Sequence, residues 1–538
     1  MAVNETSDML ILARQAHGTH DWVTAAANFD AVGAERLTAD DIAAYADALW
    51  WLGRVEDNLR LMAAACEAFL ADSRPAEAAW VAMLLGIFHM GRGDEPQAMG
   101  WIGRGGRLLE GIPECPAHGL MMQVADVEAS LQAGKPTEAV EAARRMQALG
   151  NRIGEPGLVL LGVNCEGRAL IRAGNVVDGL ALLDEAMVTA LGSRLGPFVS
   201  GSLFCHTIAS CHEVGDIGRV KRWTELTEDW LSTLPGVGVF GGLCAVHRAQ
   251  LHVLRGAWEE AERSALRVVA DLDAMRVDYA AEAWYVVGEA RRLRGDPTAA
   301  DAYKEAHARG RDPQPGRALL QLQRGDAAGA ATSVRIAVTA MGDDPLRRAP
   351  LCAAAVEITV AAGRLEDART ATSELVDTAA RFATSGLEAM AVRARGAVLL
   401  AEDRADEALP LLRAAFRRWR ELGAAYEVAG TCALLAQAYR SLGDEASAAA
   451  EDAQAEAAFE QLGAHRVVQE PPPGLSPREC QVLALVADGH SNRQIGEALF
   501  ISDRTVARHL TNIFHKIGTT SRTQAARYAI DRGLAATR

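Results

Sequence analysis

The sequence lacks the segments that mark membrane and secreted proteins. No apolar run reaches the ~18 residues that a membrane-spanning helix needs, and the N-terminus has neither the basic region nor the apolar core of a secretion signal. The nine cysteines follow no pairing pattern, which is typical of reduced thiols in a long intracellular chain. We therefore expect a cytoplasmic protein without disulfides and without membrane contact.

The sequence also lacks the motifs of common enzymes. The only Gly-Lys pair, Gly134-Lys135, is followed by Pro136, so no G-x-x-x-x-G-K-[ST] phosphate loop exists. Gly236-Val-Gly-Val-Phe-Gly241 has the glycine spacing of a dinucleotide fingerprint, but a helical pattern precedes it where that motif needs a strand. A loop between repeats is therefore the favoured interpretation. With no nucleophile–base or paired-carboxylate arrangement, we predict no enzymatic activity and no cofactor.

One group of residues suggests a metal site. On helices, Cys205 and His212 share a face, and so do Cys244 and His247 one repeat later, and four such ligands can hold zinc. The spacing matches no common zinc module, and buried cysteine is common in helical cores. Core packing is the favoured interpretation, so we predict no bound metal.

Lysine is scarce, and the charge is unevenly divided. Only four of the 55 basic residues are lysine, and the net charge is −15. Residues 475–538 hold nine basic and five acidic residues, whereas the remainder holds 46 and 65. An acidic body with a basic tail indicates that nucleic acid contacts the tail alone.

A turn signal recurs along the first 463 residues, with most spacings between 38 and 41 residues. The turns lie at Gly18, Gly53, Gly93, Gly134, Gly174, Gly215, Gly256, Gly295, Gly325, Gly363, the Glu402-Asp403 pair and Gly443. An alanine follows eight of them five residues later, at Ala98, Ala139, Ala261, Ala300, Ala330, Ala368, Ala408 and Ala448. Helical hairpins at a fixed period stack into a solenoid. The hairpin between Gly295 and Gly325 is predicted to be short.

This pattern resembles tetratricopeptide-like repeats, although its period exceeds their usual ~34 residues. The resemblance implies a concave groove that binds a small molecule, a peptide or a protein, and hence a sensory role. An oligomerisation scaffold without a small ligand is an equally open alternative. Tryptophans in the first repeats, Trp50-Trp51, Trp80 and Trp101, could line such a groove, but packing between helices is the default interpretation.

The last 64 residues are punctuated into four short helices. Capping boxes are predicted at Ser476–Glu479, Ser491–Gln494 and Ser521–Gln524, and Ser502 is predicted to cap the third helix. Glycines that can end helices stand at 489, 518 and 533. So many start and stop signals in a short stretch strongly predict a four-helix domain.

The third helix of the tail carries the functional signal. At 100° per residue, Val506, Leu510, Ile513 and Ile517 form one apolar stripe. The opposite stripe consists of Arg504, Arg508, Thr511 and His515, and a flanking stripe consists of Thr505, His509, Asn512 and Lys516. No Asp or Glu occurs from Arg504 to Ile517. Such a helix suits a DNA major groove, with the outward stripe at base edges and the flank at phosphates.

The tail resembles the C-terminal DNA-binding domain of LuxR-type transcriptional regulators. The resemblance rests on Leu-Ser-Pro-Arg-Glu at 475–479, Ser-Asn-Arg-Gln-Ile at 491–495, Ile-Ser at 501–502, Thr-Val at 505–506 and Lys-Ile-Gly at 516–518. It implies dimerisation through the fourth helix and base reading by Ala507, Arg508 and Thr511. It also implies phosphate contacts from Asn492, Arg493, Thr505 and Lys516.

Two positions depart from the family pattern. Ala507 stands where lysine is usual, which removes one contact or replaces it by a thymine methyl contact. Gly496 stands where alanine is usual, and we expect it to loosen the second helix slightly. The ATPase module of the largest LuxR-type regulators is absent, and so is a receiver domain.

The sequence therefore predicts an all-α protein with two domains. Residues 1–463 form the repeat domain, residues 464–474, with Pro471-Pro-Pro-Gly474, form a linker, and residues 475–538 form the helix-turn-helix domain. We expect a transcriptional regulator that binds double-stranded DNA as a homodimer under the control of the repeats. The alternative is a repeat-protein adaptor whose tail contacts protein rather than DNA.

Overall fold

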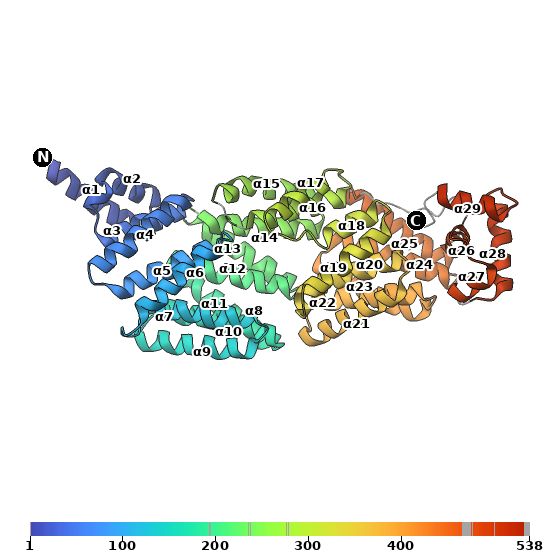
Figure 1. Ribbon diagram of the computed structural model, residues 1–538, viewed down its shortest axis with the longest axis horizontal. Coiled ribbons are helices and arrows are strands. Elements are labelled where there is room, and N and C mark those ends of the chain that lie inside the picture. Colours follow the sequence, from blue (N-terminus) through green and yellow to red (C-terminus); the bar gives the residue numbers. More distant parts are fainter. Residues whose placement is uncertain are drawn as a thin grey trace. The chain divides into compact units, whose positions relative to one another are not determined.

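The protein consists of two compact helical units, Met1–Arg466 and Val467–Arg538 (Figure 1). The computed structural model describes residues 2–531, apart from 193–194, 235, 237, 276, 278, 465–474, 476 and 500. All regular secondary structure of these residues is helical, as predicted. Every helix among these residues is too short or too polar to span a lipid bilayer. The predicted linker lies outside the described residues, apart from residue 464.

The helices of the first unit follow one another in antiparallel hairpins. Its first half contains α1 (Ala2–Gly18), α2 (Trp22–Val32), α3 (Ala39–Trp51), α4 (Val55–Ala71), α5 (Pro75–Met90), α6 (Glu95–Leu109), α7 (Pro116–Met121), α8 (Ala129–Gln132), α9 (Pro136–Ile153), α10 (Pro156–Ala173), α11 (Val176–Gly192) and α12 (Pro197–Glu213). Its second half contains α13 (Ile217–Ser232), α14 (Gly238–Arg255), α15 (Trp258–Met275), α16 (Tyr279–Arg294), α17 (Ala299–Ala308), α18 (Gly316–Gln323), α19 (Ala327–Ala340), α20 (Pro345–Ala361), α21 (Leu365–Phe382), α22 (Ser385–Ala401), α23 (Ala405–Leu422), α24 (Ala425–Ser441) and α25 (Glu445–Leu462). A 3-10 turn (Ala34–Arg36) precedes α3, and a π-helical segment (Met122–Glu128) joins α7 to α8.

The predicted turns explain how the hairpins close. Every predicted turn glycine from Gly53 to Gly443 has a positive φ angle, and Asp403 takes the same role with φ of 62°. Gly18 is an exception, because α1 continues through it and the left-handed residue is His20. The hairpin after Gly295 is short, as predicted, since α17 has 10 residues and α18 has eight.

Small residues sit where the helices of each hairpin meet. Seven of the eight predicted alanines are fully buried, namely Ala98, Ala139, Ala261, Ala330, Ala368, Ala408 and Ala448. Ala300 is only half-buried, because α17 begins at Ala299, four residues after its turn rather than the usual two, and Ala299 and Ala302 take the buried positions. The alanine pattern therefore identifies the face on which each hairpin closes.

Helices that are far apart in the sequence of the array also contact each other. The guanidinium of Arg172 in α10 bridges Glu213 of α12 and Asp344 before α20, with N–O distances of 2.5 Å to each. The hydroxyl of Thr384 donates to the carbonyl oxygen of Val214, about 170 residues away in sequence. One core cluster likewise joins α1–α5 to α12–α17. The first unit is thus held by contacts between segments far apart in sequence as well as by contacts between neighbouring helices.

The glycine-rich segment near residue 238 belongs to these contacts. Gly238 begins α14, so the part of the segment from Gly238 to Gly241 is helical rather than the predicted loop. A Cβ atom at Gly236 would lie 2.9 Å from the carbonyl oxygen of Trp51, and one at Gly238 would lie 2.7 Å from that of Trp50. The glycines therefore permit the backbone to pass close to α3.

A matched pair of glycines tests the importance of close packing. Gly167 of α10 lies against α11, where an added Cβ would be 2.8 Å from the carbonyl oxygen of Gly179. We expect Gly167→Ala to destabilise the array by about 1–3 kcal/mol, because the helices have to move apart. Gly100 in α6 has open space where a Cβ atom would be added. We therefore expect Gly100→Ala to stabilise the array by about 0.5–1 kcal/mol through helix propensity. Urea unfolding of both variants checks this, and equal midpoints would contradict it.

Candidate nucleic-acid interface

The second unit contains the four predicted helices, and two of their caps form as predicted. The helices are α26 (Pro477–Ala487), α27 (Asn492–Leu499), α28 (Asp503–Lys516) and α29 (Arg522–Asp531) (Figure 1). The Gln494 backbone N–H donates to Ser491 Oγ at 3.3 Å, and the Ser491 N–H donates to Gln494 Oε1 at 2.8 Å. Ser502 Oγ accepts from the Thr505 N–H at 3.1 Å. These contacts fix where α27 and α28 begin.

The remaining start and stop signals differ in outcome. Gly489 and Gly518 end their helices with φ angles of 84° and 67°. The box at Ser521 is only half formed, because the Gln524 N–H donates to Ser521 Oγ while the Gln524 side chain accepts from the Thr519 hydroxyl instead. The predicted signals Ser476 and Gly533 lie outside the described residues.

The apolar stripe of α28 faces the core of the unit, as predicted. Val506, Leu510 and Ile513 are buried, and Ile517 is half-buried. Their partners are Leu475, Val482, Leu483, Val486, Ile495, Ala525 and Ala529. This packing fixes the rotation of α28, and therefore which of its side chains face outward.

Gly496 has a structural role that the sequence alone did not show. It is buried, and a Cβ atom there would lie 2.6 Å from the carbonyl oxygen of Ile501. The Gly496 carbonyl oxygen accepts the Ile501 N–H at 2.9 Å. Rather than merely loosening α27, the glycine permits a tight connection between α27 and α28.

The outward face of α28 carries the residues predicted to read bases. Arg504, Ala507, Arg508 and Thr511 are all exposed. The Thr511 hydroxyl donates to the Ala507 carbonyl oxygen at 3.1 Å, which fixes its rotamer. Within the described part of the chain, neither arginine forms an ion pair. Both guanidinium groups can therefore bind an external acceptor without breaking a contact.

The residues predicted to contact phosphate are held by neighbours to different degrees. Asn492 accepts a hydrogen bond from Arg522 at 2.8 Å, and Arg522 also donates to the His490 carbonyl oxygen. Arg493 lies 3.4 Å from Glu497, with both side chains largely exposed. The hydroxyls of Thr505 and Ser502 are 2.8 Å apart. Arg522 thus positions Asn492, a role that no motif in the sequence indicated.

Lys516 has an intramolecular partner that its position on the flanking stripe of the helix did not indicate. Its Nζ atom lies 2.7 Å from Oε2 of Glu479 in α26, a carboxylate whose side chain is only 4% exposed. Glu479 was expected to cap α26, and its position at the start of that helix gave no sign of a contact 37 residues away. The ion pair ties the end of α28 to α26.

Nearby, burial lowers the pKa of His509 below its ordinary value, so the imidazole adds no charge to this flank at neutral pH.

The four Cys and His residues considered as zinc ligands lie on α12 and α14. Cys205 and Cys244 are buried in the core between α12 and α14, as the packing interpretation expected. The rings of His212 and His247 lie with their centroids 6.3 Å apart. The described residues contain no group of three or more His, Cys, Asp or Glu that could hold a metal ion.

Comparison with known proteins identifies the second unit. Residues 473–529 match the family described as "Bacterial regulatory proteins, luxR family". The transcriptional regulatory protein DegU of Brevibacillus brevis is 52% identical over 59 residues, which are 11% of this chain and 25% of that protein. LiaR of Bacillus subtilis is 49% identical over 59 residues, or 28% of its length. The chain thus spans about a quarter of the length of these curated relatives.

The first unit has distant structural neighbours. A Rap protein complexed with competence and sporulation factor is 13% identical, covers 72% of this chain and 99% of its own, and gives a TM-score of 0.36. The Cut9–Hcn1 hetero-tetramer of the APC/C is 11% identical, covers 85% of this chain and 96% of its own, and gives a TM-score of 0.35.

Together, the four-helix geometry and the family match show that the C-terminal unit of this chain is a LuxR-type helix-turn-helix domain.

Proposed function

We propose that this chain is a transcriptional regulator that places α28 in the major groove of double-stranded DNA. The observation that carries the proposal is the outward face of α28, where Arg504, Arg508 and Thr511 are exposed and no carboxylate occurs from Arg504 to Ile517. A helix fits the width of the DNA major groove, and free guanidinium groups on its outward face complement the negative charge there, while its apolar stripe packs against the domain.

In this proposal Arg508 forks onto a guanine, because its guanidinium is exposed and unpaired within the described residues. Thr511 and Ala507 line the same face, where a methyl group or hydroxyl can contact a thymine or another base edge. Arg504 lies one turn before Arg508 and reaches the neighbouring base or phosphate. Asn492, Arg493, Thr505 and Lys516 hold the phosphates and fix the register of the helix.

The proposed active form is a homodimer that pairs through α29. Of the four residues proposed to contact phosphates in each copy, only Arg493 and Lys516 carry a positive charge. A dimer doubles the number of phosphate contacts and of base contacts. Two copies related by a two-fold axis read two half-sites separated by about one helical turn or its multiples. The repeat array is proposed to control this unit in response to an effector.

Replacing Arg508 tests the groove assignment. We expect Arg508→Ala to weaken binding to the preferred operator by about 1–3 kcal/mol and to relax specificity at one base pair per half-site. Gel shifts against operators mutated one position at a time measure this. Arg335→Ala, which removes an exposed arginine in α19, is the matched control and should change nothing. An unchanged base preference in Arg508→Ala would refute the assignment, and binding to protein but not DNA would favour the adaptor alternative.

Lys516 is expected to have two separable roles. Lys516→Ala leaves the buried Glu479 without this partner and should destabilise the second unit by about 1–3 kcal/mol. It should also lower affinity equally for all DNA sequences and flatten the salt dependence. The double variant Glu479→Gln/Lys516→Ala should recover stability but not affinity. Hydrogen exchange of α26–α29 and DNA titrations at several salt concentrations separate the two effects; affinity that recovers with stability would exclude the phosphate contact.

Removing the array tests its control of DNA binding. The repeats carry 19 more acidic than basic residues in the sequence outside 475–538, so they repel a polyanion and can mask the basic unit. We expect a fragment of residues 464–538 to bind DNA more tightly than the full chain at low salt, with a smaller difference at high salt. Weaker or equal binding, at concentrations where the fragment is dimeric, would count against such control.

A further inference from the structure

A pocket with a volume of about 440 Å³ lies within the first unit, away from the proposed DNA-binding residues in the sequence. Its walls come from α1, α3, α4 and α5, and residues 196–199 at the start of α12 close one side. The pocket therefore joins two segments that are more than 100 residues apart in sequence. It has the size of a small-molecule site, for which volumes of about 300–1,000 Å³ are usual.

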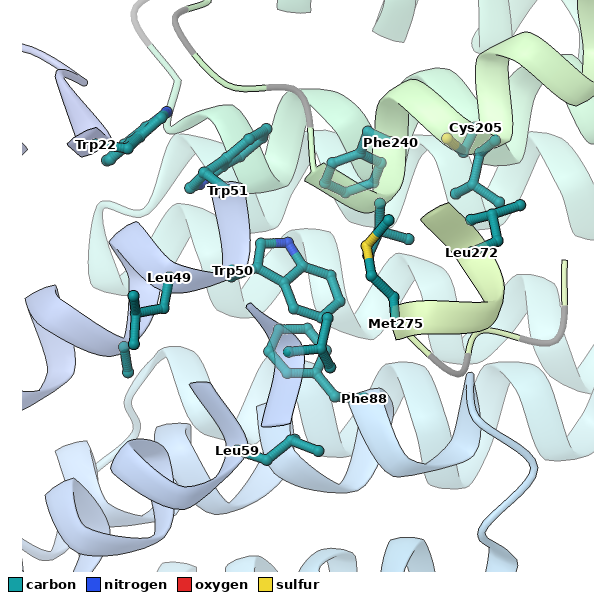
Figure 2. Close-up of a cluster of buried hydrophobic side chains, with 14 of the residues drawn as sticks. Trp22, Leu49, Trp50, Trp51, Leu59, Phe88, Cys205, Phe240, Leu272 and Met275 are labelled. Carbon is teal, nitrogen blue, oxygen red and sulfur yellow. The ribbon is translucent and has the colours of Figure 1, made fainter. Parts of the chain in front are cut away.

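Aromatic side chains form much of the wall. Trp50 stacks on Phe88 with ring centroids 3.9 Å apart and an interplanar angle of 6°, and Figure 2 shows the two rings one above the other. Phe198 from the start of α12 meets Phe88 edge-on at 5.8 Å. Trp80 also lines the pocket and is half-buried. Such a wall suits a flat apolar ring and the face of an organic cation.

The charged residues of the pocket are acidic. Asp40 and Asp47 lie seven residues apart on one face of α3 and both line the pocket. Asp40 is paired with Arg74, and the partner that the structure gives Asp47 is the Nε2 atom of His17, at 2.9 Å. Among the described residues that line the pocket none is Lys or Arg. With no Lys or Arg among the described residues of this wall, the carboxylate of Asp47 favours a cation in the pocket and disfavours an anion.

Two polar atoms on residues of the wall have no partner. Trp50 Nε1 and Asn58 Oδ1 are both buried without a hydrogen bond in the described structure, although Asn58 Nδ2 donates to the Ala46 carbonyl oxygen at 2.7 Å. Buried polar atoms are almost always paired in folded proteins. A bound molecule that reached these atoms would supply the missing acceptor and donor.

We propose that this pocket binds a small organic cation whose apolar ring system packs against Trp50, Trp80 and Phe198 and whose positive charge faces Asp47. The proposal deepens the effector control described above and rests on it for the regulatory consequence, not for the binding itself. Because the ligand touches both α3–α5 and the start of α12, it strengthens the contact between successive turns of the array.

Two dansyl probes of opposite charge test the proposal on the full chain without DNA. Dansylcholine carries a quaternary ammonium group, whereas dansylglycine carries a carboxylate on the same fluorophore. We expect dansylcholine to saturate at one site per chain and to bind roughly tenfold more tightly than dansylglycine. Equal affinities, or no saturable binding of the cation, would overturn the proposal.

Matched substitutions locate the site. Asp47→Asn should weaken dansylcholine binding at least roughly fivefold, while Asp178→Asn, an exposed carboxylate in the first turn of α11, should leave it unchanged. Phe198→Ala provides a second test that does not touch the charge, and it should also weaken binding. If neither pocket variant changes the affinity for dansylcholine, the assignment of the site to this pocket is wrong.

Repeating the DNA titration with and without saturating dansylcholine tests the regulatory role alone. An unchanged operator affinity would refute control by this ligand and leave the binding result intact.

Discussion

Close approach between helix backbones is the constraint on which the repeat unit depends. Only 5% of the residues are aromatic, so most helix pairs have no aromatic rings to bury against one another. Fully buried alanines occupy the hairpin crossings instead, and Gly167 meets the backbone of Gly179 with no room for a methyl group. Since apolar burial stabilises in proportion to area, many short contacts replace a few large ones. Nine of the 28 aromatic residues lie within residues 22–101 and ten within residues 198–303. Five residues from these two segments line the pocket of α3–α5, namely Trp50, Trp51, Trp80, Phe88 and Phe198.

Local signals in the sequence predicted local structure well. The turn glycines and the caps at Ser491 and Ser502 act over three or four residues, so their chemistry is visible in the sequence itself. The rotation of α28 was predictable for the same reason, because its apolar stripe leaves one packing choice. α17 starts two residues later after its turn than the other helices of the pattern, so Ala299 and Ala302 are buried there in place of Ala300.

Contacts between distant segments could not be predicted in this way. A period near 40 residues says which helices are neighbours along the array, but not how tightly its turns wind. The ion pairs of Arg172 with Glu213 and Asp344, and the pocket closed by Phe198, depend on that winding. Lys516 shows the same limit on a smaller scale. Its stripe on α28 placed it toward the flank, but only the fold shows that a buried carboxylate on α26 lies within reach.

The cations of the second unit differ in whether they already have a partner within the fold. Lys516 and Arg522 are engaged with Glu479, Asn492 and the His490 carbonyl oxygen, whereas Arg504 and Arg508 project from the exposed face of α28. Non-specific affinity grows with the number of phosphates neutralised, and it falls steeply with salt when that number is large. A unit that commits much of its basic charge to its own packing has few phosphate contacts to spare. Under the proposed function, tight and selective binding depends on the base contacts of α28 and on the pairing of two copies, and the proposed control by the repeat array acts on that pairing.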